Sequence, residues 1–118
     1  MADTTWQVDA LWVLAWSVHI HDQLDFGEDI PDHFVKMLPD LHAMESTHAI
    51  RESTRLRARP EILQMADLAY CLHWAIVDAS INHRPNPGRV HVYSVIMRRR
   101  ALEWLLSTDD WEHVQMDT

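Results

Sequence analysis

Hydrophobic residues follow the spacing of an α-helix over three long stretches of the chain. In the first stretch, residues 5–21, the apolar residues that follow this spacing are Val8, Leu11, Trp12, Ala15, Trp16, Val18 and Ile20. So many apolar positions leave only a narrow polar face, which is typical of a helix that is buried on most sides. We therefore predict a helix inside the core.

The strongest helical pattern covers residues 60–82. Pro60 suits the first helical turn, where a missing amide hydrogen costs little, and Glu61 suits the positive end of the helix dipole. Two apolar stripes run along this segment, one made of Tyr70, Trp74, Val77 and Ile81 at i, i+4, i+7 and i+11, the other of Leu68, Leu72 and Ile76. We predict that this helix is central to the core.

A third helix is predicted over residues 90–107, from the apolar positions Val92, Val95, Ile96, Leu102, Leu105 and Leu106. Pro85, Pro87 and Gly88 break the chain before it, and residues 22–32 form an acidic loop after the first helix. Shorter helical pieces are predicted between the principal helices, and a short turn docks Trp111. Residues 40–58 are polar enough that their order stays open. The prediction is one all-α domain over residues 1–118.

The composition supports helices and restricts the partners. Glycine occurs only twice in 118 residues, which favours long helices over strands joined by tight turns. Cys71 is the single cysteine, so a disulfide framework is impossible and a reducing compartment is expected. The first residues lack the basic start of a signal peptide, and no apolar run reaches the length of a membrane span. We expect a cytoplasmic protein without a membrane partner.

The net charge of −8 is unevenly distributed. Residues 1–50 carry nine acids and one base, residues 51–108 carry nine arginines and five acids, and residues 109–118 carry four acids. The overall acidity argues against nucleic acid as a partner. These charges are either solvated surface or a docking surface, for which a basic protein is the natural partner.

Three segments together resemble a known bacterial family. They are Leu56-Arg57 with Glu61-Ile62-Leu63, then Asp67 to Tyr70 running into Leu72-His73-Trp74-Ala75 and Asp78-Ala79, and finally Arg99 to Leu105 with Trp111 and Asp117-Thr118. The sequence is similar to the family of the domain of unknown function 4272 over residues 55–118, and loosely over the first helix. Glu112 stands where that family commonly has aspartate. The resemblance implies a helical fold and no catalytic residues.

Two carboxylates are the first candidates for a site. Asp67 and Asp78 point the same way within about 20° on a straight helix, and Arg98, Arg99 and Arg100 are the available donors. One interpretation is a set of structural ion pairs between the two helices, in which case Asp78→Ala would cost about 3–5 kcal/mol. The alternative is a ligand or active-site pocket; the candidate binding residues are Asp67, His73, Trp74, Asp78, Arg99 and Arg100.

Other chemistry has weaker support in the sequence. Nine histidines are present, but His19 with Asp22, and His42 with Glu45 and His48, do not match the H-E-x-x-H pattern of zinc hydrolases. No G-x-S-x-G motif or phosphate-binding glycine loop occurs. We assign no catalytic residue, no metal ligand and no cofactor, and a histidine metal site remains a minor alternative. Whether the chain is an enzyme stays open.

The tryptophans of the first helix suggest a contact with another copy. Trp6, Trp12 and Trp16 are many large apolar groups for one small domain, and tryptophan is enriched at the centres of protein interfaces. We therefore consider a homodimer contact through these residues, against a wholly intramolecular core. The leading hypothesis is a non-enzymatic bacterial interaction or structural protein, and the alternative is a small enzyme or ligand-binding protein.

Overall fold

The protein folds as helices, as the sequence predicts. The computed structural model describes residues 4–27, 30–31, 34, 55–85 and 91–116. These contain α1 (Thr4–Ser17), α3 (Arg59–Ile81), α4 (Val92–Leu106) and the short 3-10 helix η2 (Trp111–His113), and no strand within those ranges. The all-α prediction is confirmed. Residues 40–54, whose order the sequence left open, lie outside the described part.

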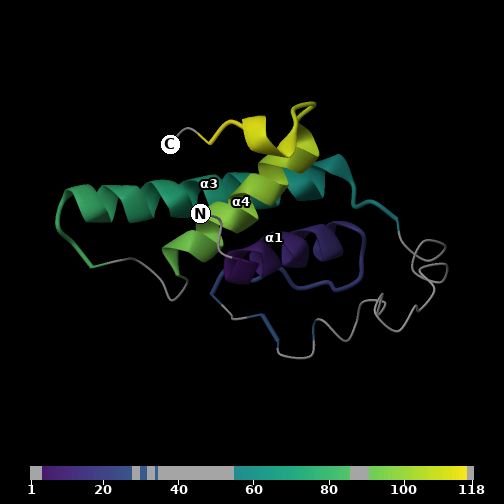
Figure 1. Ribbon diagram of the computed structural model, residues 1–118, viewed down its shortest axis with the longest axis horizontal. Coiled ribbons are helices and arrows are strands. Elements are labelled where there is room, and N and C mark those ends of the chain that lie inside the picture. Colours follow the sequence, from purple (N-terminus) through teal and green to yellow (C-terminus); the bar gives the residue numbers. More distant parts are fainter. Residues whose placement is uncertain (1–3, 28–29, 32–33, 35–54, 86–90, 117–118) are drawn as a thin grey trace.

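α4 holds the arrangement together, because it packs against α1 on one side and α3 on the other (Figure 1). The molecule is elongated along α3, with extents of 50 × 28 × 27 Å. No helix in the described ranges has both the length and the apolarity that crossing a bilayer requires.

The core lies where α1 and the loop after it meet α3 and α4. α1 contributes Trp12, Val13, Ala15 and Trp16; the loop contributes Leu24, Phe26 and Phe34; and α4 contributes Val95, Ala101 and Leu102. α3 faces this core with Ile62, Ala66, Ala69 and Ile76. Its small alanines allow the backbone of α3 to approach α4 closely.

α1 is shorter than predicted, because it ends at Ser17 rather than near residue 21. The amide of Ile20 donates to the carbonyl of Ala15 and that of His19 to Trp16, which is the Schellman pattern of hydrogen bonds that closes a helix. His19 has a φ of 65°, in the left-handed region. The same hydrogen bonds close α3 after Ile81, where the left-handed residue is His83 with a φ of 55°.

The orientation of α3 differs from the prediction. Tyr70, Trp74 and Ile81 were expected in the core, but their exposed fractions are 39%, 53% and 70%. Leu68 of the second stripe is also exposed, whereas Ile76 is buried. α3 meets the rest of the molecule through the side that carries its alanines together with Ile62 and Ile76, so Trp74 and Ile81 face outward. Tyr70 is partly exposed, and its ring still contacts Arg99 of α4. The prediction that the first stripe is core was wrong.

Candidate functional site

The most buried charged group is Arg98, and its partner comes from α1. Its Nε lies 2.9 Å from Asp9 Oδ1, and both side chains are buried. Arg98 Nη1 donates to the carbonyl of Asp25, and Ser94 Oγ donates to Asp9 Oδ2. Burial of a pair is tolerated because these hydrogen bonds satisfy the remaining polar atoms. This pair fixes α4 against α1, and neither Asp67 nor Asp78 takes part.

Arg99 joins α4 to α3 and to the end of the described chain. Its Nη1 donates to the Met116 carbonyl at 3.1 Å and lies 3.0 Å from His73 Nδ1. Its guanidinium covers the Tyr70 ring at 4.9 Å, and its Nε lies 3.5 Å from Glu103. Since a guanidinium has no lone pair to offer, the His73 nitrogen that faces it must be unprotonated. The cluster is a structural contact between helices.

Arg100 fastens η2 to α4. Its Nε and Nη2 both donate to the Trp111 carbonyl, at 3.1 and 2.6 Å, and the guanidinium lies 4.7 Å from the centre of the Trp111 ring. Trp104 meets the same ring edge to face. The predicted docking of Trp111 is confirmed.

The two predicted carboxylates do not meet these arginines. Asp78 Oδ2 accepts from Arg84 Nη2 at 2.6 Å, at the exposed end of α3, and Asn82 donates to its other oxygen. Asp67 is exposed, and within the described residues it has no ion pair. The expectation that they bond to Arg98, Arg99 and Arg100 was wrong. Both carboxylates lie away from α4, because the side of α3 that packs against α4 carries alanines.

Arg57 is a structural residue that sequence reasoning missed. Its Nε donates to the Trp16 carbonyl at 2.6 Å and its Nη2 to the His21 carbonyl at 3.0 Å, while the guanidinium covers the Trp16 ring at 4.5 Å. A cation that binds the last carbonyls of α1 also suits the negative end of that helix. Arg57 belongs to a segment of the family resemblance, but Arg55, Arg57 and Arg59 alternate in sequence, and no local pattern shows that the middle one binds α1.

Two of the predicted interface tryptophans, Trp12 and Trp16, pack inside the molecule. Trp12 stacks on His21 with ring centres 3.4 Å apart and meets Phe34 edge to face. Trp12 and Trp16 are both buried, whereas the side chain of Trp6 lies outside the described part. No exposed ring of Trp12 or Trp16 is left for a second copy.

Burial lowers the pKa of His21 and of His73 below the ordinary value for histidine. The charge of Arg99 lowers the pKa of His73 further, and that of Arg57 acts in the same direction on His21. Both imidazoles are therefore mostly neutral at pH 7. His21 Nε2–H donates to the Trp12 carbonyl at 2.8 Å, and this hydrogen bond opposes the effect of burial by raising the pKa of His21.

No three metal-binding side chains gather anywhere in the described ranges. His42, Glu45 and His48 lie outside those ranges, while His19 and Asp22 meet at the surface, 3.8 Å apart. The H-x-x-E-x-x-H pattern of His42, Glu45 and His48 is therefore known from the sequence alone.

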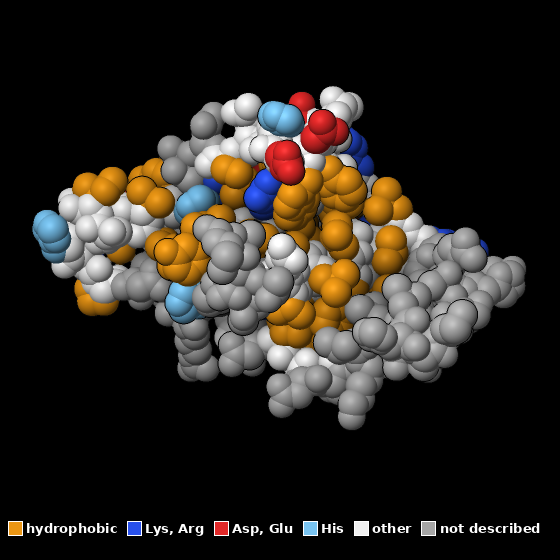
Figure 2. Space-filling model, viewed as in Figure 1, with side chains coloured by type: hydrophobic (Ala, Val, Ile, Leu, Met, Phe, Trp, Pro, Cys, Tyr) orange, Lys and Arg blue, Asp and Glu red, His pale blue; other side chains and the backbone are white. Residues whose placement is uncertain are grey.

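The outer face of α3 is the most unusual surface. We call Leu63, Tyr70, Trp74, Val77 and Ile81 the α3 stripe; Val77 is half-buried, and the other four are 39–70% exposed. Hydrophobic side chains are visible at the surface along α3 in Figure 2. Large apolar side chains that repeat on one exposed helix face indicate a contact surface.

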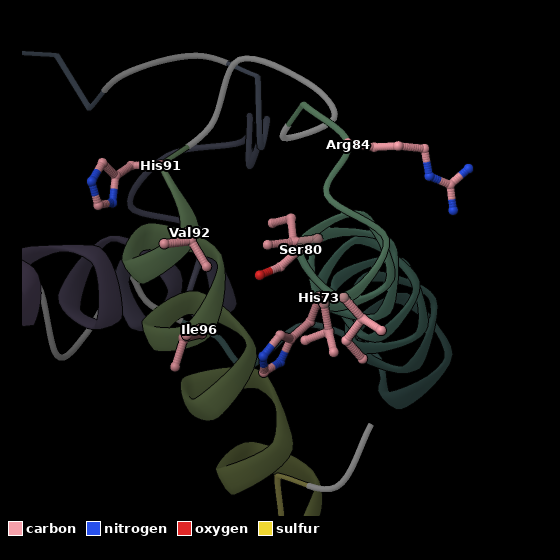
Figure 3. A pocket seen from close by; sticks show the side chains of 9 residues that line it. His73, Ser80, Arg84, His91, Val92 and Ile96 are labelled. Atoms are coloured by element: carbon pink, nitrogen blue, oxygen red, sulfur yellow. The ribbon is translucent and has the colours of Figure 1, made fainter.

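A groove adjoins the stripe between α3 and α4, with a volume of about 610 Å³. It is lined mainly by apolar side chains; its lining consists of His73, Ile76, Val77, Ser80, Ile81, Arg84, His91, Val92 and Ile96. In Figure 3, His73 and Ser80 extend from α3 toward the side of α4 that carries Val92 and Ile96. Arg84 and His91 lie at the same end of the groove, after α3 and before α4, and point outward to opposite sides. Val77 and Ile81 belong to both the stripe and the groove.

A second apolar surface lies over α1, α4 and η2, where Figure 2 shows hydrophobic side chains in the middle of the molecule. Two adjacent hollows of about 580 and 360 Å³ share Leu11 and Leu14. Trp111 lines one and Trp104 the other. Trp104 is 36% exposed and Leu11 is 41% exposed, less than Trp74 and Ile81.

The candidate residues of the sequence thus fall into separate places. His73 lines the groove, and Trp74 lies on the stripe. Asp67 and Asp78 are on the outer surface of α3. Arg99 donates to the Met116 carbonyl and Arg100 to the Trp111 carbonyl. The sequence model of one family, Domain of unknown function (DUF4272), matches residues 1–114. No curated protein and no solved structure matches the chain.

Proposed function

The chain belongs to the DUF4272 family, and from its surface we propose that it is a protein-interaction domain that binds another polypeptide on the α3 stripe. One observation carries this proposal. The apolar side chains that a core helix would bury face outward on α3, while the alanines of the same helix pack inward.

The exposed side chains have the composition of an interface centre. Tyrosine and tryptophan are enriched among the residues that dominate binding energies, and the charged residues are depleted there. The stripe has two such rings, and none of its five members is charged. Asp67 and Asp78 lie beside it as part of a polar rim.

The adjoining groove supports a helical partner. An amphipathic helix binds an apolar groove through residues at i, i+3, i+4 and i+7. The groove runs between two helices, and Val77 and Ile81 connect its wall to the stripe. A partner helix laid along α3 would therefore contact both surfaces at once.

The test is photo-crosslinking in the native cells, with a benzophenone amino acid in place of Trp74. The control places it at Leu68, which is also exposed on α3 but is rotated by about 120° from Trp74 around the helix axis. We expect a discrete protein adduct from position 74 and none from position 68. No adduct from position 74, or the same adducts from both positions, would refute the proposal.

A small-molecule site is the second candidate, because the volume of the groove lies within the range of known ligand pockets. His73 and Ser80 would then orient the polar part of an apolar molecule. Native mass spectrometry of the purified protein tests this directly. A bound mass that His73→Ala removes would favour a ligand, whereas a bare protein would argue for the interaction surface.

A further inference from the structure

We propose that the polypeptide bound on the α3 stripe is a second copy of this chain, with the two α3 helices antiparallel about a two-fold axis between Tyr70 and Trp74. This inference rests on the proposed function, and it names the partner. It goes beyond Trp12 and Trp16 of α1, which the core already uses.

Four of the five residues of the stripe are spaced symmetrically about its centre; the fifth, Val77, would lie opposite Asp67 of the other copy. The intervals from Leu63 to Tyr70, Trp74 and Ile81 are seven, four and seven residues. If one helix is reversed, Leu63 therefore meets Ile81 and Tyr70 meets Trp74, and the residue numbers in each facing pair add to 144. A two-fold interface requires this self-complementarity, because each patch contacts the same patch on the other copy. A different partner would place no such condition on the stripe.

The intervals also suit two helices packed side by side. Steps of seven and four residues keep apolar side chains on one seam, as in helices that cross at about 20°. The seam from Leu63 to Ile81 is about 27 Å long at 1.5 Å per residue. Both ends lie inside α3, which spans Arg59–Ile81.

The apolar area of the stripe is a substantial part of what a dimer needs. From their exposed fractions, Tyr70 and Trp74 contribute roughly 200 Å² per copy, if a whole aromatic side chain buries 150–250 Å². Leu63, Val77 and Ile81 add to this, as does the rim of the groove. A standard interface buries about 800 Å² per partner, so the aromatic pair alone supplies roughly a quarter.

Light scattering on the purified 118-residue chain tests whether this dimer forms. We expect twice the 13.9 kDa chain mass at high concentration. Leu63→Glu should raise the dissociation constant at least about 30-fold, because it places a carboxylate against the partner's apolar Ile81. Ile81→Glu should do the same, which guards against a folding defect of one variant. Leu68→Glu is the matched control, since Leu63 and Leu68 are both 46% exposed on the same helix; it should leave the dimer intact.

The register has its own test, by cysteine cross-linking in a Cys71→Ser background. An equal mixture of the Leu63→Cys and Ile81→Cys proteins should form covalent dimers under mild oxidation, and either protein alone should not. Cross-linking of each protein alone would indicate parallel helices and overturn the register. A dimer that cross-links in neither experiment would overturn it as well.

Failure of this inference can be told from failure of the proposed function. A chain that stays monomeric from micromolar to millimolar concentration refutes the second copy. If position 74 then still crosslinks to a different protein in the cell, the stripe remains an interaction surface with another partner. If it crosslinks to nothing, both statements are wrong.

Discussion

The buried ion pair between Asp9 and Arg98 shows how much a single contact depends on its surroundings. Both side chains are less than 7% exposed, whereas the Asp78–Arg84 pair is 36% and 61% exposed. Removing one member of a buried pair leaves an uncompensated charge in the core, but an exposed charge is simply solvated.

Asp9→Ala should therefore lower the free energy of unfolding by about 3–5 kcal/mol, and Asp78→Ala by less than about 1 kcal/mol. Chemical denaturation of both variants checks the contrast. Equal losses in the two variants would show that Asp9 is not the residue that fixes α1 to α4.

The left-handed residues at the two helix ends are both histidines. A side chain in this region costs about 1–2 kcal/mol, which glycine avoids. His83→Gly should raise the free energy of unfolding by about 0.5–1 kcal/mol after the greater entropy of the unfolded glycine is included. His83→Ala removes the same imidazole but keeps the strained φ, so a gain in this control would contradict the explanation. Thermal or urea unfolding measures both.

Burial lowers the pKa of His21 and His73, so the folded state binds protons less readily than the unfolded state. Their contribution to stability is complete above the unfolded value of about 6.5 and is lost as the pH falls below it. Urea unfolding at pH 8 and at pH 5 should show a loss at the lower pH. The double variant His21→Gln/His73→Gln should show a smaller loss, and an unchanged pH dependence would contradict this explanation.

Among the elements, α3 shows what periodicity can and cannot predict. The sequence places its helix at residues 60–82, and the structure places it at Arg59–Ile81. Helical spacing reports that a segment is helical, but apolar residues surround most of this helix. Which face of α3 is buried depends on the side chains that α4 places against it. The sequence of α3 alone therefore does not predict that Ala66 and Ala69 face α4.

Two isoleucines of α3 distinguish its faces. Ile76 is 7% exposed and Ile81 is 70% exposed. Ile76→Ala should cost about 2–5 kcal/mol because it leaves a cavity, and Ile81→Ala should change stability by less than about 0.5 kcal/mol. Unfolding at low concentration, where the chain is monomeric, separates this effect from any dimer. A large loss for Ile81→Ala would show that the α3 stripe packs within the chain.

The candidate site was harder to predict than the helices. His73 and Trp74 were recognised from the sequence, and both lie at the groove or the stripe. The partners of the arginines were missed because they are distant in sequence: Asp9 precedes Arg98 by 89 residues and Trp16 precedes Arg57 by 41. Such pairs follow from how helices pack, which no local pattern encodes. Four of the five stripe residues were recognised as one face of this helix, but they were assigned to the core; Leu63, seven residues before Tyr70, was missed.

At the scale of the whole molecule, the described part has one side of α3 that its own core does not use. Arg57, Arg98, Arg99 and Arg100 donate to the carbonyls of Trp16, Asp25, Met116 and Trp111 respectively, and so they stabilise the fold. What the surface offers beyond them is apolar area on a rigid helix. This division between a polar framework and an apolar outer stripe is the basis of the interaction proposal.

Hydroxyl-radical footprinting of the purified chain at low and high concentration tests this central claim most directly. Tyr70 and Trp74 lie on the stripe, whereas Trp104 and Leu68 are exposed elsewhere and serve as internal controls. We predict that oxidation of Tyr70 and Trp74 slows at high concentration while that of Trp104 and Leu68 does not. If the oxidation rates of Tyr70 and Trp74 are the same at low concentration, at high concentration and in extract of the native cells, the interaction surface on α3 is contradicted.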